Sequence, residues 1–342
     1  MVQPRDMEET GVHGTCIWLQ PAAEERLSEK IYEMNYTTVT TFLLQGFENL
    51  HEFKAFIFIV FLLVYLVTLL GNLLIITLVS ISHHLHMPMF FFLGHLSFSD
   101  VLLTTVIVPN MLYIILEGGG ILSVSDCITQ FFFYGATATT ECLLLTAMSY
   151  DRYLAICNPL YYNAIMNFRL CLQLVFYCWL LGFMLTVFTT LCLQSVWFCG
   201  PNVIDHFFCD LGPLLELSCT DTSMVKMEVF AVSSLLTIAP FVFITATYVC
   251  IFISILKIAS IKGRQKTFST CSSHLAVVCI YYGALFAMYV VPSRGFGLNI
   301  NKVVSLMYTV VTPLCNPIIY SLRNQEIKST IRKYVGVKRA NI

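Results

Sequence analysis

Seven long apolar stretches, separated by shorter polar segments, dominate the hydrophobic pattern of this chain. They extend over residues 56–81, 89–116, 125–156, 170–193, 227–258, 268–291 and 303–322. Each is long enough for a membrane-spanning helix, which needs about 20 apolar residues. Strands of a membrane β-barrel would instead alternate apolar and polar positions over segments of about ten residues. The pattern therefore predicts an all-α membrane protein, a seven-transmembrane helix bundle.

The composition supports this class. Of the 342 residues, 57% are hydrophobic and only 11% are charged, whereas soluble domains carry about 25% charged residues. The formal net charge of −1 gives no indication of a nucleic-acid partner, and none is expected. Membrane lipid is the expected surrounding partner.

The basic residues indicate an orientation. Lys and Arg accumulate on the cytoplasmic side of membrane proteins. With the N-terminus outside, 12 of the 19 Lys and Arg residues fall on the cytoplasmic side. We therefore expect a multi-pass protein of the plasma membrane with an extracellular N-terminus and a cytoplasmic C-terminus.

The chain is then expected to divide into three parts. These are an extracellular tail (1–55), the helical domain (56–322) and a cytoplasmic amphipathic helix with a short tail (323–342). The first part contains the sequon Asn35-Tyr36-Thr37, which makes Asn35 a candidate for glycosylation. In the last part, Ile327, Ile331 and Val335 recur between basic residues, at the spacing of a helix that lies in the membrane interface.

Charged residues within the apolar stretches point to function, because a charge at membrane depth costs at least a few kcal/mol. Asp151-Arg152 ends the third stretch and is either a simple interfacial ion pair or a functional one. Asp100 and Glu141 lie in the middle of stretches. Both are expected to face the bundle interior and to share a proton or a cation.

Four cysteines lie in or beside the expected outer loops, in an oxidising compartment. They are Cys127, Cys199, Cys209 and Cys219. Four cysteines allow three pairings, and spacing alone does not choose between them. Metal binding is the competing reading, but the ten-residue spacing and the lack of CxxC pairs disfavour it.

Six motifs occur in order along the stretches. They are Gly71-Asn72, residues 85–93, Leu96-Ser97-Phe98-Ser99-Asp100, residues 148–160, residues 266–275, and residues 313–324 with Asn316-Pro317-Ile318-Ile319-Tyr320. Together they resemble the olfactory receptors, in their class II (tetrapod) branch, within the rhodopsin-like G-protein-coupled receptor superfamily. The resemblance covers about residues 34–335.

The resemblance implies roles for several of these residues. It implies the disulfides Cys127–Cys209 and Cys199–Cys219. It implies that Asp151 holds Arg152 in the inactive state and releases it on activation. The other implied switch residues are Tyr248, His274, Asn316, Pro317 and Tyr320. For His274 a role as an ordinary core residue stays open.

A polar cluster is implied at the centre of the bundle. It contains Asn72, Asp100, Glu141 and Asn316. We hypothesise that Asp100 and Glu141 bind Na⁺ in the inactive state. The alternative is a protonated, hydrogen-bonded carboxyl pair. No other cofactor is expected.

The resemblance also places a ligand pocket in the outer half of the bundle. The matching positions are Tyr134, Gly135, Ala138, Thr139, Cys142, Ser233, Thr237, Tyr282, Leu285, Phe286, Tyr289, Leu306 and Thr309. Apolar walls with a few hydroxyls suit a small, mostly hydrophobic molecule. Because Tyr134 stands where amine receptors carry an acid, a salt-bridged amine is not expected.

The expected function is that of an odorant receptor that binds a small volatile odorant and activates a stimulatory heterotrimeric G protein, raising cAMP. No catalytic motif of a hydrolase, zinc protease, nucleotide-binding or dinucleotide-binding enzyme occurs, so no enzyme activity is expected. One alternative is a chemoreceptor of the same family that senses a metabolite outside the nose. A multi-span transporter fits poorly, because internal repeats are not seen.

Overall fold

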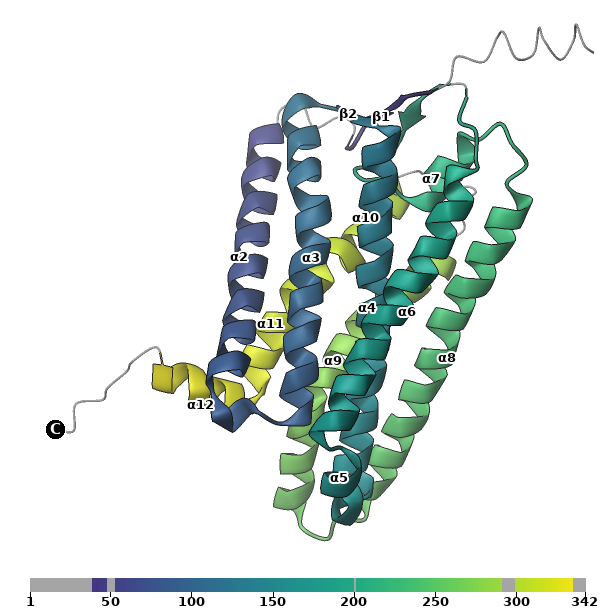
Figure 1. The fold of residues 1–342 in the computed structure, drawn as a ribbon. Coiled ribbons are helices and arrows are strands. Elements are labelled where there is room, and N and C mark those ends of the chain that lie inside the picture. Colours follow the sequence, from purple (N-terminus) through teal and green to yellow (C-terminus); the bar gives the residue numbers. More distant parts are fainter. Residues whose placement is uncertain (1–38, 48–52, 200, 291–298, 335–342) are drawn as a thin grey trace, which may run out of the picture. The chain divides into compact units, whose positions relative to one another are not determined.

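The protein is described by a computed structural model that covers residues 39–47, 53–199, 201–290 and 299–334. Long helices form a bundle (Figure 1). They are α2 (Lys54–Ile81), α3 (Pro88–Glu117), α4 (Val124–Cys157), α6 (Phe168–Gln194), α8 (Ser223–Leu256), α9 (Ile261–Val290), and the continuous series α10 (Asn299–Leu306), η2 (Met307–Val311) and α11 (Thr312–Arg323). Asn35 lies outside the described residues.

Short elements connect and flank these helices. They are η1 (His83–Leu85), α5 (Pro159–Ile165), α7 (Leu211–Glu216) and α12 (Gln325–Tyr334), which lies near the C-terminal end of α11 (Figure 1). In α12, Ile327 is buried, as the amphipathic spacing predicts. The Asn324 side chain begins this helix by accepting hydrogen bonds from the backbone N–H groups of Glu326 and Ile327.

The prediction of a seven-helix membrane bundle is confirmed. Within the described residues, six helices are long and apolar enough to cross a membrane. A seventh span is α9, which bends by 45° between Ser269 and Cys271. On α2, the buried residues are Thr68, Asn72, Ile75 and Leu78, while ten of its large apolar side chains are exposed. This arrangement fits a helix whose outer surface faces lipid.

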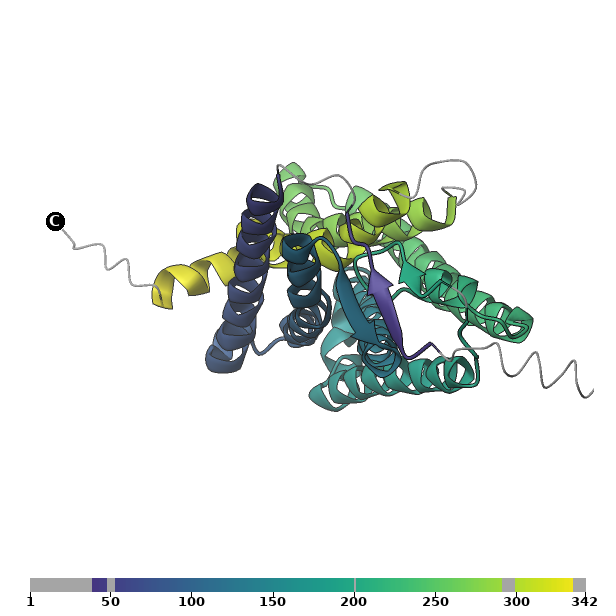
Figure 2. The same ribbon diagram turned by 90° about the horizontal axis from the view of Figure 1, so that it is seen from above.

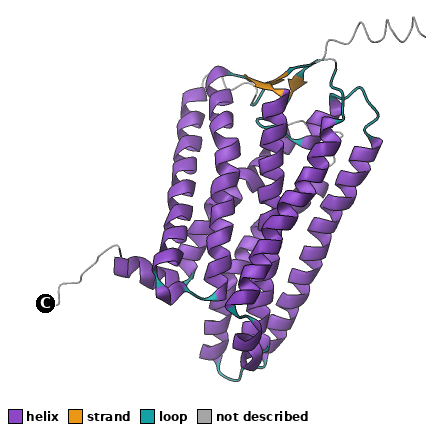
Figure 3. Ribbon diagram, viewed as in Figure 1, coloured by secondary structure: helices purple, strands orange, loops and turns teal. Residues whose placement is uncertain are grey.

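One end of the bundle carries a three-stranded sheet (Figures 2 and 3). Its central strand β1 (Thr41–Leu44) pairs antiparallel with β2 (Gly120–Ser123) and parallel with β3 (Val203–Ile204). In β1, Phe42 and Leu44 are fully buried, and the Phe42 ring lies 5.2 Å from that of Phe198. This part of the expected N-terminal tail is thus a strand held by apolar contacts.

The same end carries both disulfides, Cys127–Cys209 and Cys199–Cys219, with Cα atoms 5.4 and 5.8 Å apart. We call it the disulfide end, and the opposite end, where Arg152 lies, the Arg152 end. The helices α4 and α8 both begin at the disulfide end and run in the same direction (Figure 1). Their residues therefore descend in parallel toward Arg152.

Candidate functional site

A cavity of about 470 Å³ opens among α4, α6, α8, α9 and α7. Eight of the residues predicted for the ligand pocket line it: Tyr134, Gly135, Ala138, Thr139, Cys142, Ser233, Thr237 and Leu285. Its volume and its mixture of apolar walls with a few polar groups are typical of a small-molecule site.

Four other predicted pocket residues do not line this cavity. Leu306 packs in the apolar cluster of α3 and η2, and the hydroxyl of Thr309, a fully buried residue, donates to the Ser305 carbonyl at 2.7 Å. Tyr282 and Phe286 line a separate groove of about 550 Å³ between α8 and α9. The side chain of Tyr289 lies outside the described residues.

The cavity also has walls that were not predicted. Helix α6 contributes Leu185, Thr186 and Thr189, and the segment around α7 contributes Asp210, Leu211, Gly212 and Leu215. A Cβ atom on Gly135 would lie 3.0 Å from the Thr186 side chain, so α4 and α6 approach closely here. In the sequence, the glycines Gly135 and Gly182, which lie at this contact, could have indicated that α6 forms a wall of the cavity.

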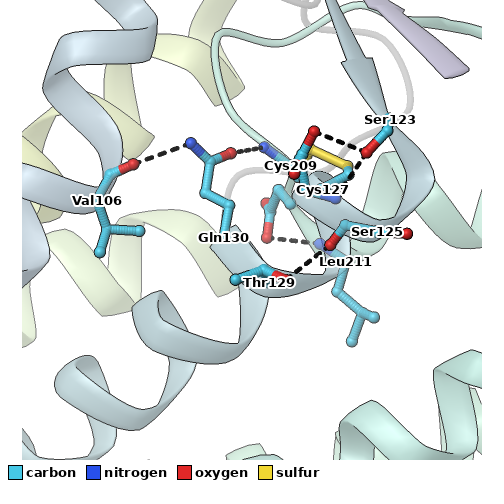
Figure 4. The surroundings of a disulfide bond; sticks show 10 residues. Val106, Ser123, Ser125, Cys127, Thr129, Gln130, Cys209 and Leu211 are labelled. Atoms are coloured by element: carbon cyan, nitrogen blue, oxygen red, sulfur yellow. Dashed lines mark hydrogen bonds between the residues drawn. A yellow bond between two sulfur atoms is a disulfide. The ribbon is translucent and has the colours of Figure 1, made fainter.

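The segment before Cys209 closes the disulfide end of the bundle. Gln130 on α4 donates to the Val106 carbonyl at 3.0 Å and accepts from the Cys209 N–H at 2.9 Å (Figure 4). It therefore joins α3, α4 and the disulfide. Phe207 and Phe208 are fully buried in the cluster with α3 and η2.

Charged and titratable side chains lie beside this closure. Lys302 on α10 forms an ion pair with Asp205. His206 is only 3% exposed, and neither ring nitrogen has a hydrogen-bond partner among the described residues. Burial, with a smaller effect of the Lys302 charge, lowers the pKa of His206 to about 4. The imidazole is therefore neutral at pH 7.

The predicted polar cluster is present at the centre of the bundle. Asn316 donates its amide to both Asp100 oxygens, at 3.1 and 2.9 Å. Because Pro317 lacks an N–H, the carbonyl of Pro313 has no helical partner, and Asn72 donates to it instead at 3.1 Å. Gly71 allows this approach, since a Cβ there would lie 3.0 Å from the Pro317 ring.

Oxygen atoms of this cluster, and of residues within one helical turn of it, remain without partners among the described residues. They are Asn72 Oδ1, Ser97 Oγ, Glu141 Oε1, Asn316 Oδ1 and the Tyr320 hydroxyl. Glu141 also interacts electrostatically with Asp100. Buried polar atoms normally have a partner, and a set of carboxylate, amide and hydroxyl oxygens suits a hard cation or ordered water. The residues therefore fit the Na⁺ ion that the sequence suggested.

Arg152 is held at its own end of the bundle. Its guanidinium pairs with the fully buried Asp151, with Nε donating to Oδ2 at 2.9 Å. The Tyr162 hydroxyl on α5 donates to the other Asp151 oxygen at 2.8 Å. Burial, followed by the Asp151 charge, raises the pKa of Tyr162, so this phenol remains a donor. Asp151 thus binds Arg152 and α5 at once.

Two further switch candidates lie together beside this pair. The hydroxyl of Tyr248 on α8 lies 2.7 Å from His274 Nδ1 on α9. His274 Nε2 lies 3.2 Å from the Leu145 carbonyl on α4. A tautomer that carries its hydrogen on Nε2 satisfies both contacts. His274 therefore joins α4, α8 and α9.

A second cavity, of about 610 Å³, opens at the Arg152 end. Its lining includes Arg152, Tyr162, Lys262, Arg323 and Glu326. Among the described residues, no group of three or more His, Cys, Asp or Glu side chains has the arrangement of a metal site. His84, in η1, instead contacts Glu326 of α12 at 2.6 Å.

A bundle of seven spans with a cavity at one end and a held arginine in a cleft at the other defines a G-protein-coupled receptor. The comparison with protein families agrees. The family model described as Olfactory receptor matches residues 61–338. The chain belongs to the olfactory receptor family, as the sequence motifs predicted, and is an odorant receptor rather than an enzyme.

Curated relatives match nearly the whole length of the chain. Olfactory receptor 11L1 from Homo sapiens is 48% identical over 304 residues, which are 89% of this chain and 94% of the relative. Olfactory receptor 5G9 from Mus musculus is 46% identical, with coverages of 88% and 96%. Olfactory receptor 6Q1 from Homo sapiens is 46% identical, with coverages of 88% and 95%.

Proposed function

We propose that this receptor binds small, mostly hydrophobic odorants in the cavity at the disulfide end and activates a stimulatory G protein, raising cAMP. The observation that carries the proposal is that the same helices line the cavity and meet near Arg152. The cavity is lined by α4, α8 and α9, and the same three helices are joined near Arg152 by His274. A ligand that changes their packing in the cavity therefore acts on the helices that hold the Arg152 end.

The orientation belongs to the proposal as well. Disulfides form in oxidising compartments, which supports an extracellular disulfide end. The Arg152 end then faces the cytoplasm, and its cavity of about 610 Å³, with Arg152, Lys262 and Arg323, is the docking site for the G protein. Activation requires that the ligand bind one conformation more tightly than the other.

A cAMP reporter assay in cells, with an odorant panel, tests this function. The wild type is expected to respond to at least one odorant, and Arg152→Ala is expected to lose the response. Arg169→Ala is the matched control, because Arg169 is an exposed arginine near the same end. A full response from Arg152→Ala at equal surface expression would contradict the coupling role.

The polar cluster is proposed to hold Na⁺ in the inactive state, bound by Asp100 and Glu141. The orphaned oxygens around these carboxyl groups support this proposal. Replacing Na⁺ by a large organic cation is then expected to raise basal activity or agonist potency in membranes. Unchanged basal activity and potency would favour a protonated carboxyl pair instead.

A metabolite receptor outside the nose is the second candidate for the biological setting. Its cavity, coupling and membrane orientation would be the same. Expression of the receptor in olfactory neurons, measured against other tissues, distinguishes the two settings.

A further inference from the structure

Three hydroxyls in the ligand cavity make no hydrogen bond to any described residue. They belong to Thr139 on α4 and to Ser233 and Thr237 on α8. Other cavity threonines already have partners: Thr186 donates to the Gly182 carbonyl at 2.8 Å, and Thr189 lies 3.2 Å from the Leu185 carbonyl and 3.1 Å from Glu228 Oε1 on α8. The unbonded hydroxyls are thus confined to the walls formed by α4 and α8.

The contact between α4 and α8 fixes the depth of these hydroxyls. The Cys142 thiol on α4 donates to the Leu236 carbonyl on α8 at 3.0 Å. Thr139 and Ser233 each precede these residues by three positions, which is about 4.5 Å closer to the disulfide end along a helix. Because the helices run in parallel, the two hydroxyls lie at one level on facing walls.

Thr237 follows Leu236 directly and lies one helical turn beyond Ser233, about 6 Å closer to the Arg152 end. The residue is only 7% exposed, yet it lines the cavity. Its hydroxyl makes no hydrogen bond to a described residue and can therefore bond to a molecule in the cavity.

Charged side chains are absent at this level among the described residues that line the cavity. The two charged lining residues are Asp210, which caps α7, and Lys226. Lys226 precedes Ser233 by seven residues, or about 10 Å along α8, and helical side chains lean toward the N-terminus, away from Ser233. An ionised ligand group at the level of Ser233 would be buried without an opposite charge, which is strongly unfavourable.

We propose that Thr139, Ser233 and Thr237 form a hydroxyl clamp that selects odorants carrying a neutral oxygen. The class comprises alcohols, aldehydes, ketones and esters, because a hydroxyl both donates and accepts hydrogen bonds. Phe131, Leu185 and Leu285 form apolar walls for the hydrocarbon part. This inference rests on the proposed odorant-binding function and specifies its ligand class.

The test uses probes that share a carbon skeleton. Octane, octanol, octanal, octanoate and octylamine, with the matching cyclic and aromatic series, are applied to cells that carry the receptor and a cAMP reporter. The most potent agonists are expected among the neutral oxygenated compounds. A hydrocarbon, a carboxylate or an amine as the best agonist would overturn the clamp.

The variants Thr139→Val, Ser233→Ala and Thr237→Val remove one hydroxyl each with little change in shape. For each hydrogen bond that the agonist makes, its half-maximal concentration is expected to rise roughly ten-fold. Thr129→Val is the matched control, because Thr129 lies on α4 outside the cavity lining and its hydroxyl already donates to the Ser125 carbonyl at 2.8 Å. It is expected to leave the potency nearly unchanged.

The outcomes separate the two proposals. A wild type that is present at the surface but silent to every compound counts against the odorant-binding function and the clamp together. A wild-type response that is equally potent in all three hydroxyl variants overturns the clamp alone. The same holds if Thr129→Val weakens the response as much as Thr139→Val.

Discussion

Lys302 is a charged residue buried at the disulfide end, and it is more deeply buried than Asp205, its partner in an ion pair. The Lys302 side chain is 2% exposed and that of Asp205 is 22% exposed. Removing one member of a buried pair leaves the other charge uncompensated, at a cost of about 3–5 kcal/mol. We expect this cost for Asp205→Asn, because the remaining Lys302 ammonium is shielded from water.

The reverse change is expected to be milder. In Lys302→Met, the unpaired Asp205 carboxylate is partly hydrated, and the methionine retains the apolar stem. The expected loss is about 1–2 kcal/mol, the usual range for a lost polar contact. The double variant Asp205→Asn with Lys302→Met contains neither charge. It is therefore expected to be more stable than Asp205→Asn alone.

Thermal unfolding of the purified receptor in detergent measures these differences. For chains of 150–250 residues, 1 kcal/mol corresponds to about 2–4 °C in the midpoint. The order of the midpoints is the decisive result, since unfolding of such a protein is rarely reversible. If Lys302→Met lowers the midpoint as much as Asp205→Asn, or if the two losses add in the double variant, the difference in burial does not determine how much stability each variant loses.

Three further changes test the surroundings of the site. Stability should fall by about 3 kcal/mol as the pH drops from 6.5 to about 4, because His206 takes up a proton in the unfolded chain first; a midpoint series over pH should be flatter for His206→Phe. Gly182→Ala should destabilise the receptor by a few kcal/mol, because the new Cβ would lie 2.7 Å from a backbone oxygen of α4. Gly283→Ala is the control, because its Cβ would meet no atom within 4 Å. The midpoints of thermal unfolding should fall for the first variant and not for the second. Tyr162→Phe should raise the basal cAMP signal several-fold by loosening Asp151; an unchanged basal signal would contradict the lock.

The spans could be predicted because each apolar run is long enough to cross the membrane. Hydropathy indicates the part of a helix that lies in the membrane, but not where the helix begins and ends. The prediction for the sixth span began at residue 268, whereas α9 begins at Ile261. The intervening turns contain Lys262 and Arg264, which extend the helix beyond the apolar layer. Similarly, α8 begins at Ser223, four residues before the predicted start.

Contacts between distant segments could not be predicted in the same way. Strand β1 has four residues and pairs with segments about 80 and 160 residues away. The α6 wall was missed because Gly182, Thr186 and Thr189 mark a packed face of α6 without indicating which element that face contacts. Two adjacent threonines illustrate a further limit of prediction from the sequence. Thr140 donates to the Ala136 carbonyl at 2.8 Å, while Thr139 has no such bond. Only the folded geometry distinguishes them.

The floor of the cavity and the Arg152 end are connected by two sets of hydrogen bonds between the same three helices. At the floor, Cys142 on α4 bonds to the Leu236 carbonyl on α8 and to the Tyr282 hydroxyl on α9. One helical turn further, the Leu145 carbonyl on α4 bonds to His274, which bonds to Tyr248. A ligand that separates α8 from α4 at the floor therefore strains both sets. The ligand affects the Arg152 end only if it binds more tightly to the conformation in which both sets of hydrogen bonds are broken.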